Sequence, residues 1–121
     1  MSQLFLISGA LFAGLSVILG AFAAHGLKSR LSEYAIGVFQ TGVEYQMYHA
    51  LGLILLGILA KFGVNLTISG YFMIAGIVLF SGSLYVLALT SIKWFGPITP
   101  IGGLCFIIAW AAMIIKLLQM K

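Results

Sequence analysis

The sequence predicts an all-α integral membrane protein, a four-helix bundle formed by one domain over residues 1–121. Hydrophobic residues make up 63% of the chain and charged residues 7%, whereas a typical soluble domain is about 45–50% apolar and about 25% charged. A soluble fold of this length could not bury so much apolar surface. The apolar residues fall into four long stretches, each near the roughly 20 residues that a helix needs to cross a bilayer.

The first predicted span covers residues 4–24 and contains no charged side chain. Small residues recur along it at four-residue intervals, at Ser16, Gly20 and Ala24. Small residues at this spacing favour close packing against a neighbouring membrane helix. A short polar connection, "HGLKSRLSE" (25–33), follows the span.

The second predicted span covers residues 42–60 and follows an interfacial lead-in helix at residues 32–41. Ser32 is a suitable N-cap for the lead-in, in which polar and apolar residues are mixed. The almost continuously apolar part, residues 45–60, would measure only about 24 Å at the helical rise, which is short of the roughly 30 Å of hydrocarbon. The span should therefore begin about one turn earlier, with a bend near Gly42.

The third span is predicted at residues 66–90, after a tight turn at residues 61–65, and the fourth at residues 101–118. Neither span contains an acidic residue. Thr99 and Pro100 have the residue types expected at the N-cap and the first position of the fourth helix. Four spans place both chain termini on one side of the membrane, which we call side B. Side A is the side of the first and third loops.

The charged side chains are few and scattered, with six basic and two acidic residues and a formal net charge of +4. The composition therefore gives no support to nucleic-acid binding. The basic residues are divided equally between the two sides, so their number does not set the orientation. Because the first helix usually dominates orientation, we expect side A in the cytoplasm. Side A holds Lys28, Arg30 and Lys93, and side B holds Lys61, Lys116 and Lys121.

Polar residues from four segments fall in the side-A half of the predicted bundle, whereas the side-B half is almost purely apolar. Tyr45 and His49 share one face of the second span, and Ser81 and Tyr85 share one face of the third. At the helical rise His49 would lie about 10 Å deep and Ser81 about 13 Å deep, so we expect these faces to meet. The predicted polar cluster consists of His25, Glu44, Tyr45, Gln46, His49, Ser81, Ser83, Tyr85, Thr99 and Gly102.

Four motifs in this order resemble the signatures of a known family. They are "LGAFAAHGL" (19–27), "VEYQMYHALGLILLG" (43–57), "LFSGSLYVLALT" (79–90) and "TPIGGL" (99–104). The chain is similar to the YgdD/YwdK family, domain of unknown function 423, which is related to the small TMEM-256 proteins. The resemblance covers nearly the whole chain and implies a bacterial inner-membrane protein with four spans. It implies no reaction. The residues that match are His25, Tyr45, Gln46, His49, Ser81, Gly82, Tyr85, Thr99, Pro100 and Gly102.

Several kinds of site are compatible with the cluster. His25, His49 and Glu44 have the types of metal ligands, but their spacing matches no metal motif, so we predict neither a metal nor a cofactor. A proton or ion path could use His49 with neighbouring hydroxyl groups, although the side-B half offers no polar continuation. Hydrolase chemistry through Ser81 or Ser83 lacks the strained turn that presents a nucleophile.

Two further readings involve the membrane itself. A lipid, quinone or lipid headgroup could bind in a pocket open to side A, at the N-terminus of the fourth helix near Gly102, Gly103 and the interfacial Trp94. Alternatively, the cluster is structural, because several interhelical hydrogen bonds together specify one packing.

We therefore predict a non-enzymatic bacterial inner-membrane protein that supports envelope integrity or a membrane complex. The alternative is a small transporter or a lipophilic-ligand binder. The expected partners are membrane lipid and either a second copy of the chain or another membrane protein.

Overall fold

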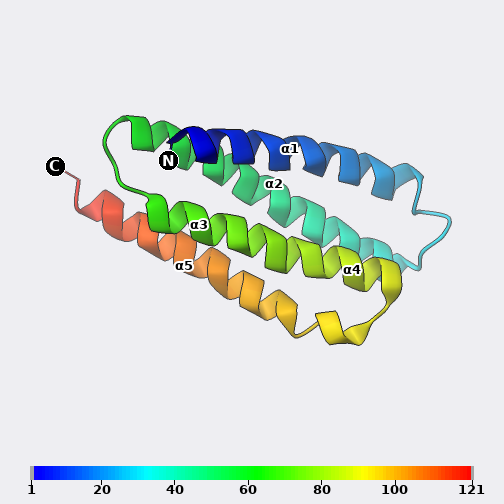
Figure 1. Cartoon of the computed structure of the whole chain (residues 1–121). Helices are drawn as coiled ribbons and strands as arrows, with labels where there is room; N and C mark the ends of the chain where they lie inside the picture. Colours follow the sequence, from blue (N-terminus) through cyan, green and yellow to red (C-terminus); the bar gives the residue numbers. More distant parts are fainter. Residues whose placement is uncertain (1, 121) are drawn as a thin grey trace.

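Four helical rods lie side by side in the computed structural model, which describes residues 2–120 (Figure 1). The first two rods are α1 (Ser2–His25) and α2 (Glu33–Lys61). The third consists of α3 (Thr67–Gly76), the π-helical η1 (Ile77–Ser81) and α4 (Gly82–Thr90), and the fourth of the 3-10 helix η2 (Lys93–Phe95) and α5 (Ile98–Leu118). Each rod is long and apolar enough to cross a membrane. The predicted all-α bundle of four membrane helices is confirmed.

The lead-in and the second span form one continuous α-helix of 29 residues, α2. Its N-cap is Ser32, as predicted, and the Ser32 hydroxyl accepts a hydrogen bond from the Ala35 N–H at 3.1 Å. At the helical rise α2 is about 42 Å long, which exceeds the roughly 30 Å of hydrocarbon. A helix of this length can place its first turns outside the hydrocarbon without any break.

The start of the fourth span differs from the prediction. Helix α5 begins at Ile98 with Pro97 in the N-cap position, so Thr99 lies inside the first turn and is not the cap. Pro97 has φ −65° and ψ −17°, a helical backbone conformation, which its ring favours at a helix start. The Thr99 hydroxyl is thereby free to bond across to α4.

The π-helical segment η1 interrupts the third rod where Gly102 of α5 approaches the backbone of Phe80. At its end, the Gly82 N–H bonds back to the carbonyls of Ile77 and Leu79. A Cβ atom added at Gly102 would lie 2.7 Å from Cα of Phe80 and closer still to the Phe80 backbone nitrogen. Such π segments are short and frequently occur at functional sites.

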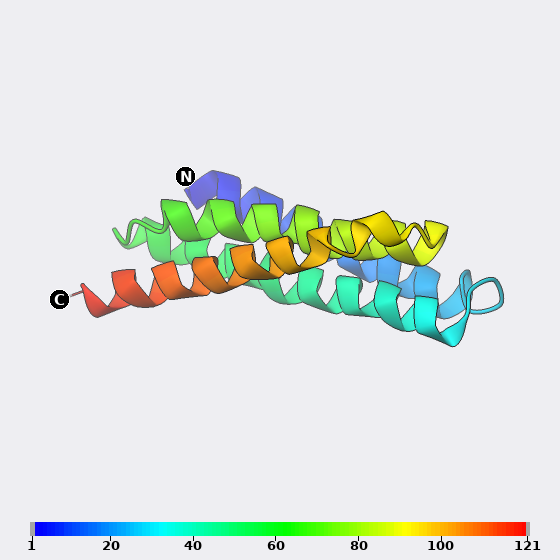
Figure 2. The same ribbon diagram turned by 90° about the horizontal axis from the view of Figure 1, so that it is seen from below.

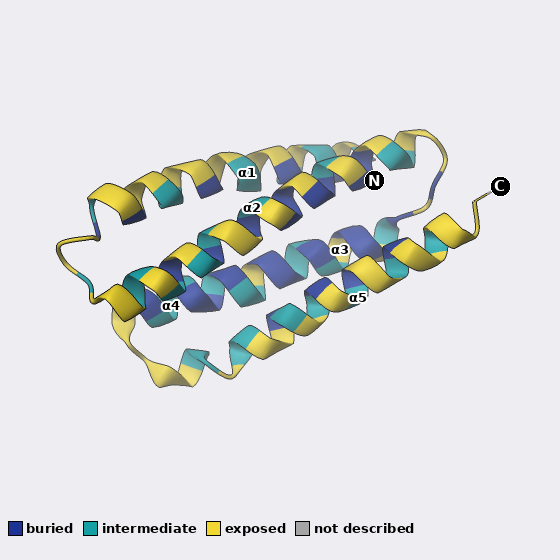
Figure 3. Ribbon diagram, turned by 180° about the vertical axis from the view of Figure 1, so that it is seen from behind, coloured by how far each residue is buried: buried dark blue, intermediate teal, exposed yellow. Residues whose placement is uncertain are grey.

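The two outer rods pack on opposite sides of an inner pair. Helix α1 packs on α2, and α5 packs on α3 and η1, so α1 and α5 lie at the two edges (Figures 1 and 2). The outward faces of the rods are exposed along their length (Figure 3), and a bundle of this composition presents such faces to lipid. On α1 the buried small residues are Gly9, Ser16 and Ala23, while Ala24 is exposed. The predicted small-residue stripe is therefore shifted by one residue at its end.

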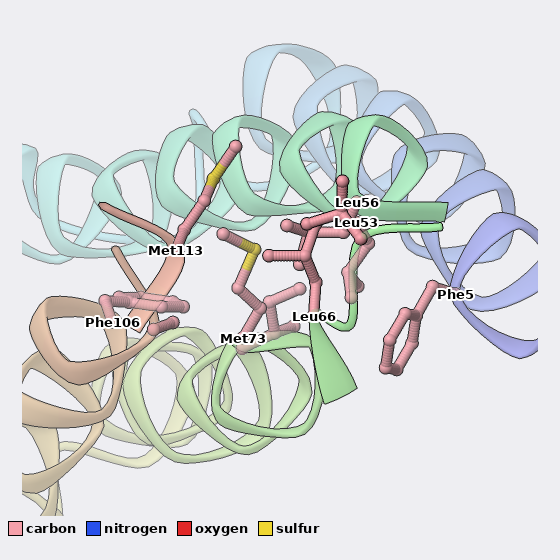
Figure 4. Packing of buried hydrophobic residues seen from close by; sticks show 10 residues of the cluster. Phe5, Leu53, Leu56, Leu66, Met73, Phe106 and Met113 are labelled. Carbon is pink, nitrogen blue, oxygen red and sulfur yellow. The ribbon is translucent and has the colours of Figure 1, made fainter. Parts of the chain in front are cut away.

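The main apolar core fills the side-B half and the middle of the bundle (Figure 4). It draws on all four rods, and its buried members include Phe5, Leu53, Leu56, Met73 and Phe106. A second, smaller cluster lies toward side A around Phe39 and Ala88. The polar residues lie between and beside these two clusters.

Candidate functional site

Gln46 connects three of the four rods. Its side chain is 3% exposed. Its Nε2 donates to the carbonyl of Phe12 on α1 at 2.9 Å, and its Oε1 accepts the hydroxyl hydrogen of Tyr85 on α4 at 2.6 Å. About one turn of α2 nearer to side A, the Ser81 hydroxyl donates to the Gly42 carbonyl at 2.6 Å. This group of bonds ties the third rod to α2 and α2 to α1.

His49 lies in the middle of the membrane-spanning region and is bonded through both ring nitrogens. It precedes the end of α2 by about 18 Å along the helix axis. Trp110 of α5 donates its indole N–H to Nε2 at 2.9 Å. Nε2 must therefore be the unprotonated nitrogen, so Nδ1 carries the hydrogen and donates it to the Tyr45 carbonyl at 2.8 Å. The ring also stacks on Phe106, with centroids 3.6 Å apart and planes at 8°.

A third pair of hydroxyl groups joins α4 to α5. The oxygens of Ser83 and Thr99 are 2.6 Å apart, and Ser83 also donates to the Phe80 carbonyl at 2.9 Å. Thr99 must then be the donor to Ser83, because a hydroxyl has a single hydrogen. Gly102 follows Thr99 on the same helix and lets α5 approach the backbone of η1.

Two predicted cluster residues lie outside these groups. His25 is exposed at the last residue of α1, and Glu44 is exposed on the outer face of α2. Tyr45 is 38% exposed, and its ring packs against Phe80 and Phe106. Helix α2 therefore turns Gln46 and His49 inward and leaves Glu44 and Tyr45 at or near its surface.

The pairs expected between the second and third spans are replaced by others. We expected His49 on the second span to meet Ser81 on the third, and Tyr45 to lie near Tyr85. Instead Ser81 bonds to a backbone carbonyl, Tyr85 bonds to Gln46, and His49 bonds to Trp110. The physical reason is the rotation of α2, which presents Gly42 and Gln46 to the third rod and places His49 toward α5.

The sequence reasoning did not include Trp110. It lies within an apolar run of the fourth span and reads there as one more lipid-facing aromatic residue. Its indole N–H is a donor that needs an acceptor when it lies deep in a bilayer. Because His49 is a mid-span residue that needs a hydrogen-bond partner, its pairing with Trp110 could have been found from the two side-chain chemistries together.

The residues present offer little to a metal ion. Among residues 2–120, three or more His, Cys, Asp or Glu side chains nowhere gather closely enough to hold a metal. His25 is exposed at the last residue of α1, at its side-A end, whereas His49 is buried in the middle of α2. The nitrogens of His49 are both engaged in hydrogen bonds, so a metal would have to displace Trp110.

The bond between Gln46 and Tyr85 gives a first prediction. Gln46→Leu should destabilise the protein by about 1–2 kcal/mol, because it leaves the Tyr85 hydroxyl without its acceptor. Combining it with Tyr85→Phe should recover most of that loss, since both partners are then apolar. Unfolding by sodium dodecyl sulfate in mixed micelles measures the four free energies of this cycle. Additive single-variant losses would contradict the bond.

Comparison with known proteins places the chain in a family. The model of the family described as "Protein of unknown function (DUF423)" matches residues 19–103. The UPF0382 membrane protein SH2409 of Staphylococcus haemolyticus is 50% identical over 115 residues, covering 94% of each chain. The UPF0382 membrane protein YwdK of Bacillus subtilis is 49% identical over 116 residues, covering 93% of this chain and 94% of its own. No solved structure matches the chain.

The matched region contains most of the polar framework. Residues 19–103 include Gln46, His49, Ser81 and Tyr85, and Phe12 and Trp110 lie outside it. The similar relatives are bacterial and are named membrane proteins, in agreement with the four membrane helices. The chain is thus a multi-pass protein of a bacterial inner membrane, and it belongs to the DUF423 family.

Proposed function

We propose that this protein is a non-enzymatic component of the bacterial inner membrane that supports envelope integrity, as a homo-oligomer or within a larger membrane complex. The observation that supports this proposal is the closure of its polar network. Gln46 uses both ends of its amide, and His49 uses both ring nitrogens, on partners within the bundle. The groups that would be needed for chemistry or transport instead hold the helices together.

A transport path would need polar groups that continue across the membrane. On the side-B side of His49 the bundle is filled by an apolar core that includes Leu53, Leu56 and Met73. On its side-A side, Gln46 and Tyr85 are bonded to each other. An ion entering from side A would thus have to break existing hydrogen bonds and would then find no polar continuation among these core residues.

A hydrolytic centre would need a serine that donates to a histidine base. Ser81 and Ser83 donate to backbone carbonyls. The ring of His49 accepts from Trp110, and Glu44 lies on the outer face of α2. The three residue types of a triad are therefore present in the sequence but are not arranged as one.

Genetic complementation tests the proposal with the polar groups removed and the packing kept. Deleting the gene should increase uptake of a hydrophobic dye that the intact envelope excludes. Wild-type protein should restore exclusion, and so should the double variant Gln46→Leu with Tyr85→Phe, provided that immunoblots show equal abundance. Failure of the double variant at equal abundance would mean that the polar groups themselves act, and would overturn the structural role. A deletion strain with unchanged dye uptake would overturn the proposed support of envelope integrity.

One groove supports the second candidate function, binding of a lipophilic ligand. It has a volume of about 300 Å³ and lies between α4 and the start of the fourth rod. Nothing would lie within 4 Å of a Cβ atom added at Gly82, so Gly82→Leu should fill the groove without a clash. Native mass spectrometry should then show a retained lipophilic molecule in wild type and in Gly14→Leu, which also has open space, but not in Gly82→Leu. Equal retention in all three would exclude this groove as the site. The groove is lined by Val78, Leu79, Gly82, Ser83, Val86, Phe95 and Ile98.

A further inference from the structure

A cavity of about 220 Å³ lies at the side-B end of the bundle, between the first turn of α3 and the last turns of α5. One water molecule occupies about 30 Å³ in the liquid, so the cavity can hold a group of several heavy atoms. It is lined by Asn65, Leu66, Thr67, Ile68, Ser69, Ala112, Ile115 and Lys116.

Ser69 is one of the residues that line the cavity, and its hydroxyl group has no partner. The residue is 1% exposed, and its Oγ is the single buried side-chain polar atom within residues 2–120 that makes no hydrogen bond. Buried polar groups in native proteins nearly always have a partner, and an exception calls for an explanation. The Oγ atom is enclosed in this conformation, so a ligand in the cavity would supply the missing partner after the Ser69 side chain rotates about its Cα–Cβ bond.

The first turn of α3 adds backbone donors at the same place. Asn65 accepts hydrogen bonds from the backbone N–H and the hydroxyl of Thr67, at 3.2 and 2.8 Å. The first intrahelical bond is donated by the Gly70 N–H, so the N–H groups of Ile68 and Ser69 have no acceptor within the helix. Such N–H groups, together with the helix dipole, favour an anion.

The charge distribution also favours an anion at this end. Lys116 lines the cavity from α5. The two acidic residues of the chain, Glu33 and Glu44, both lie in the first half of α2, toward side A. The last carbonyls of α5 are satisfied locally, because the Gln119 N–H bonds to those of Ile115 and Lys116.

We propose that this cavity binds a phosphate group, with Ser69, the first turn of α3 and Lys116 as its donors. The phosphate would belong to an anionic phospholipid of the side-B leaflet or to a free phosphate ion. This site is separate from the polar network and does not depend on the function proposed above.

Ligand-induced shifts in melting temperature test the site in dodecyl maltoside micelles, which carry no phosphate. The probes are dioleoylphosphatidylglycerol, inorganic phosphate, and dioleoylglycerol, which has the same acyl chains without a phosphate. The variants are Ser69→Ala, Lys116→Gln and Lys61→Gln. Lys61 is a matched control, because it lies at the same end and carries the same charge but does not line the cavity.

At least one phosphate probe should stabilise wild type and Lys61→Gln alike, while Ser69→Ala and Lys116→Gln weaken its apparent affinity about tenfold. A response to phosphatidylglycerol alone identifies a lipid headgroup, and a response to inorganic phosphate identifies a free anion. Without ligand, Ser69→Ala should melt no lower than wild type, because it removes an unpartnered hydroxyl. Three results would overturn the site: no shift with either phosphate probe, equal affinity in all variants, or an equal shift with dioleoylglycerol.

Discussion

Replacing Gly102 with alanine should destabilise the protein by about 3 kcal/mol, although alanine is the better helix former. The added methyl group would lie 2.7 Å from Cα and Cβ of Phe80 and closer to its backbone nitrogen. A side chain can rotate away from such a contact, but the backbone of η1 cannot. Helix α5 would have to move outward, which would weaken the packing of Phe106 against His49.

The neighbouring Gly103 is a matched control for this variant. A methyl group there would meet only the ring of Phe80, at 3.8 Å, which is ordinary contact. Gly103→Ala should therefore be neutral or stabilise the protein by up to about 1 kcal/mol, as expected for removing glycine from a helix. Unfolding by sodium dodecyl sulfate in mixed micelles compares the two variants with wild type. If both had the same free energy of unfolding, the close approach of α5 to η1 would be wrong.

The fold could be predicted from the sequence because the membrane leaves few choices. Backbone polar groups in a bilayer must be satisfied internally, so a long apolar stretch has to become a helix. Four such stretches and the cap at Ser32 were therefore sufficient to place the rods. The π-helical η1 was not predictable in this way, because it depends on how closely another helix approaches. The start of α5 was predicted at Pro100, whereas the helix begins at Ile98 after Pro97. The sequence alone does not decide between the two, because Pro97 suits a helix start as well as Pro100 does.

The polar residues could be assigned to one half of the membrane but not to their partners. The position of a residue along a helix follows from counting, whereas its partner depends on the rotation of two helices about their axes. A rotation of α2 by a fraction of a turn decides whether Gln46 or Tyr45 meets Tyr85. For the same reason His49 could be recognised as a residue that needs a partner, while the partner, Trp110, could not be read from spacing.

His49 and Trp110 hold together two helices that otherwise have few direct contacts. Helix α5 packs mainly on α3 and η1, and α2 packs mainly on α1 and the third rod. The imidazole stacked on Phe106 and bonded to Trp110 spans the remaining gap. Trp110 is itself 37% exposed, so it covers His49 on the side that faces lipid. Loss of His49 should consequently affect the whole α2–α5 contact.

We expect His49→Ala to destabilise the protein by about 3 kcal/mol. The ring stacked on Phe106 is replaced by a cavity, and the indole N–H of Trp110 loses its acceptor in the middle of the bilayer. His49→Phe keeps a ring against Phe106 and loses only the hydrogen bonds, so its cost should be smaller, about 1–2 kcal/mol. His25→Ala changes an exposed residue at the end of α1 and should stay within about 0.5 kcal/mol of wild type.

The same unfolding titration measures these variants, and Trp110 reports on the site directly. In a Trp94→Phe background the remaining indole fluorescence comes from Trp110 alone, since the chain has two tryptophans. His49→Phe should shift its emission to shorter wavelength, because the indole N–H then lacks a polar partner. Adding Trp110→Phe to His49→Phe should restore part of the lost stability, since neither side of the bond remains. Equal losses from His49→Ala and His25→Ala, together with unchanged Trp110 emission, would show that the mid-membrane bond does not hold α2 to α5.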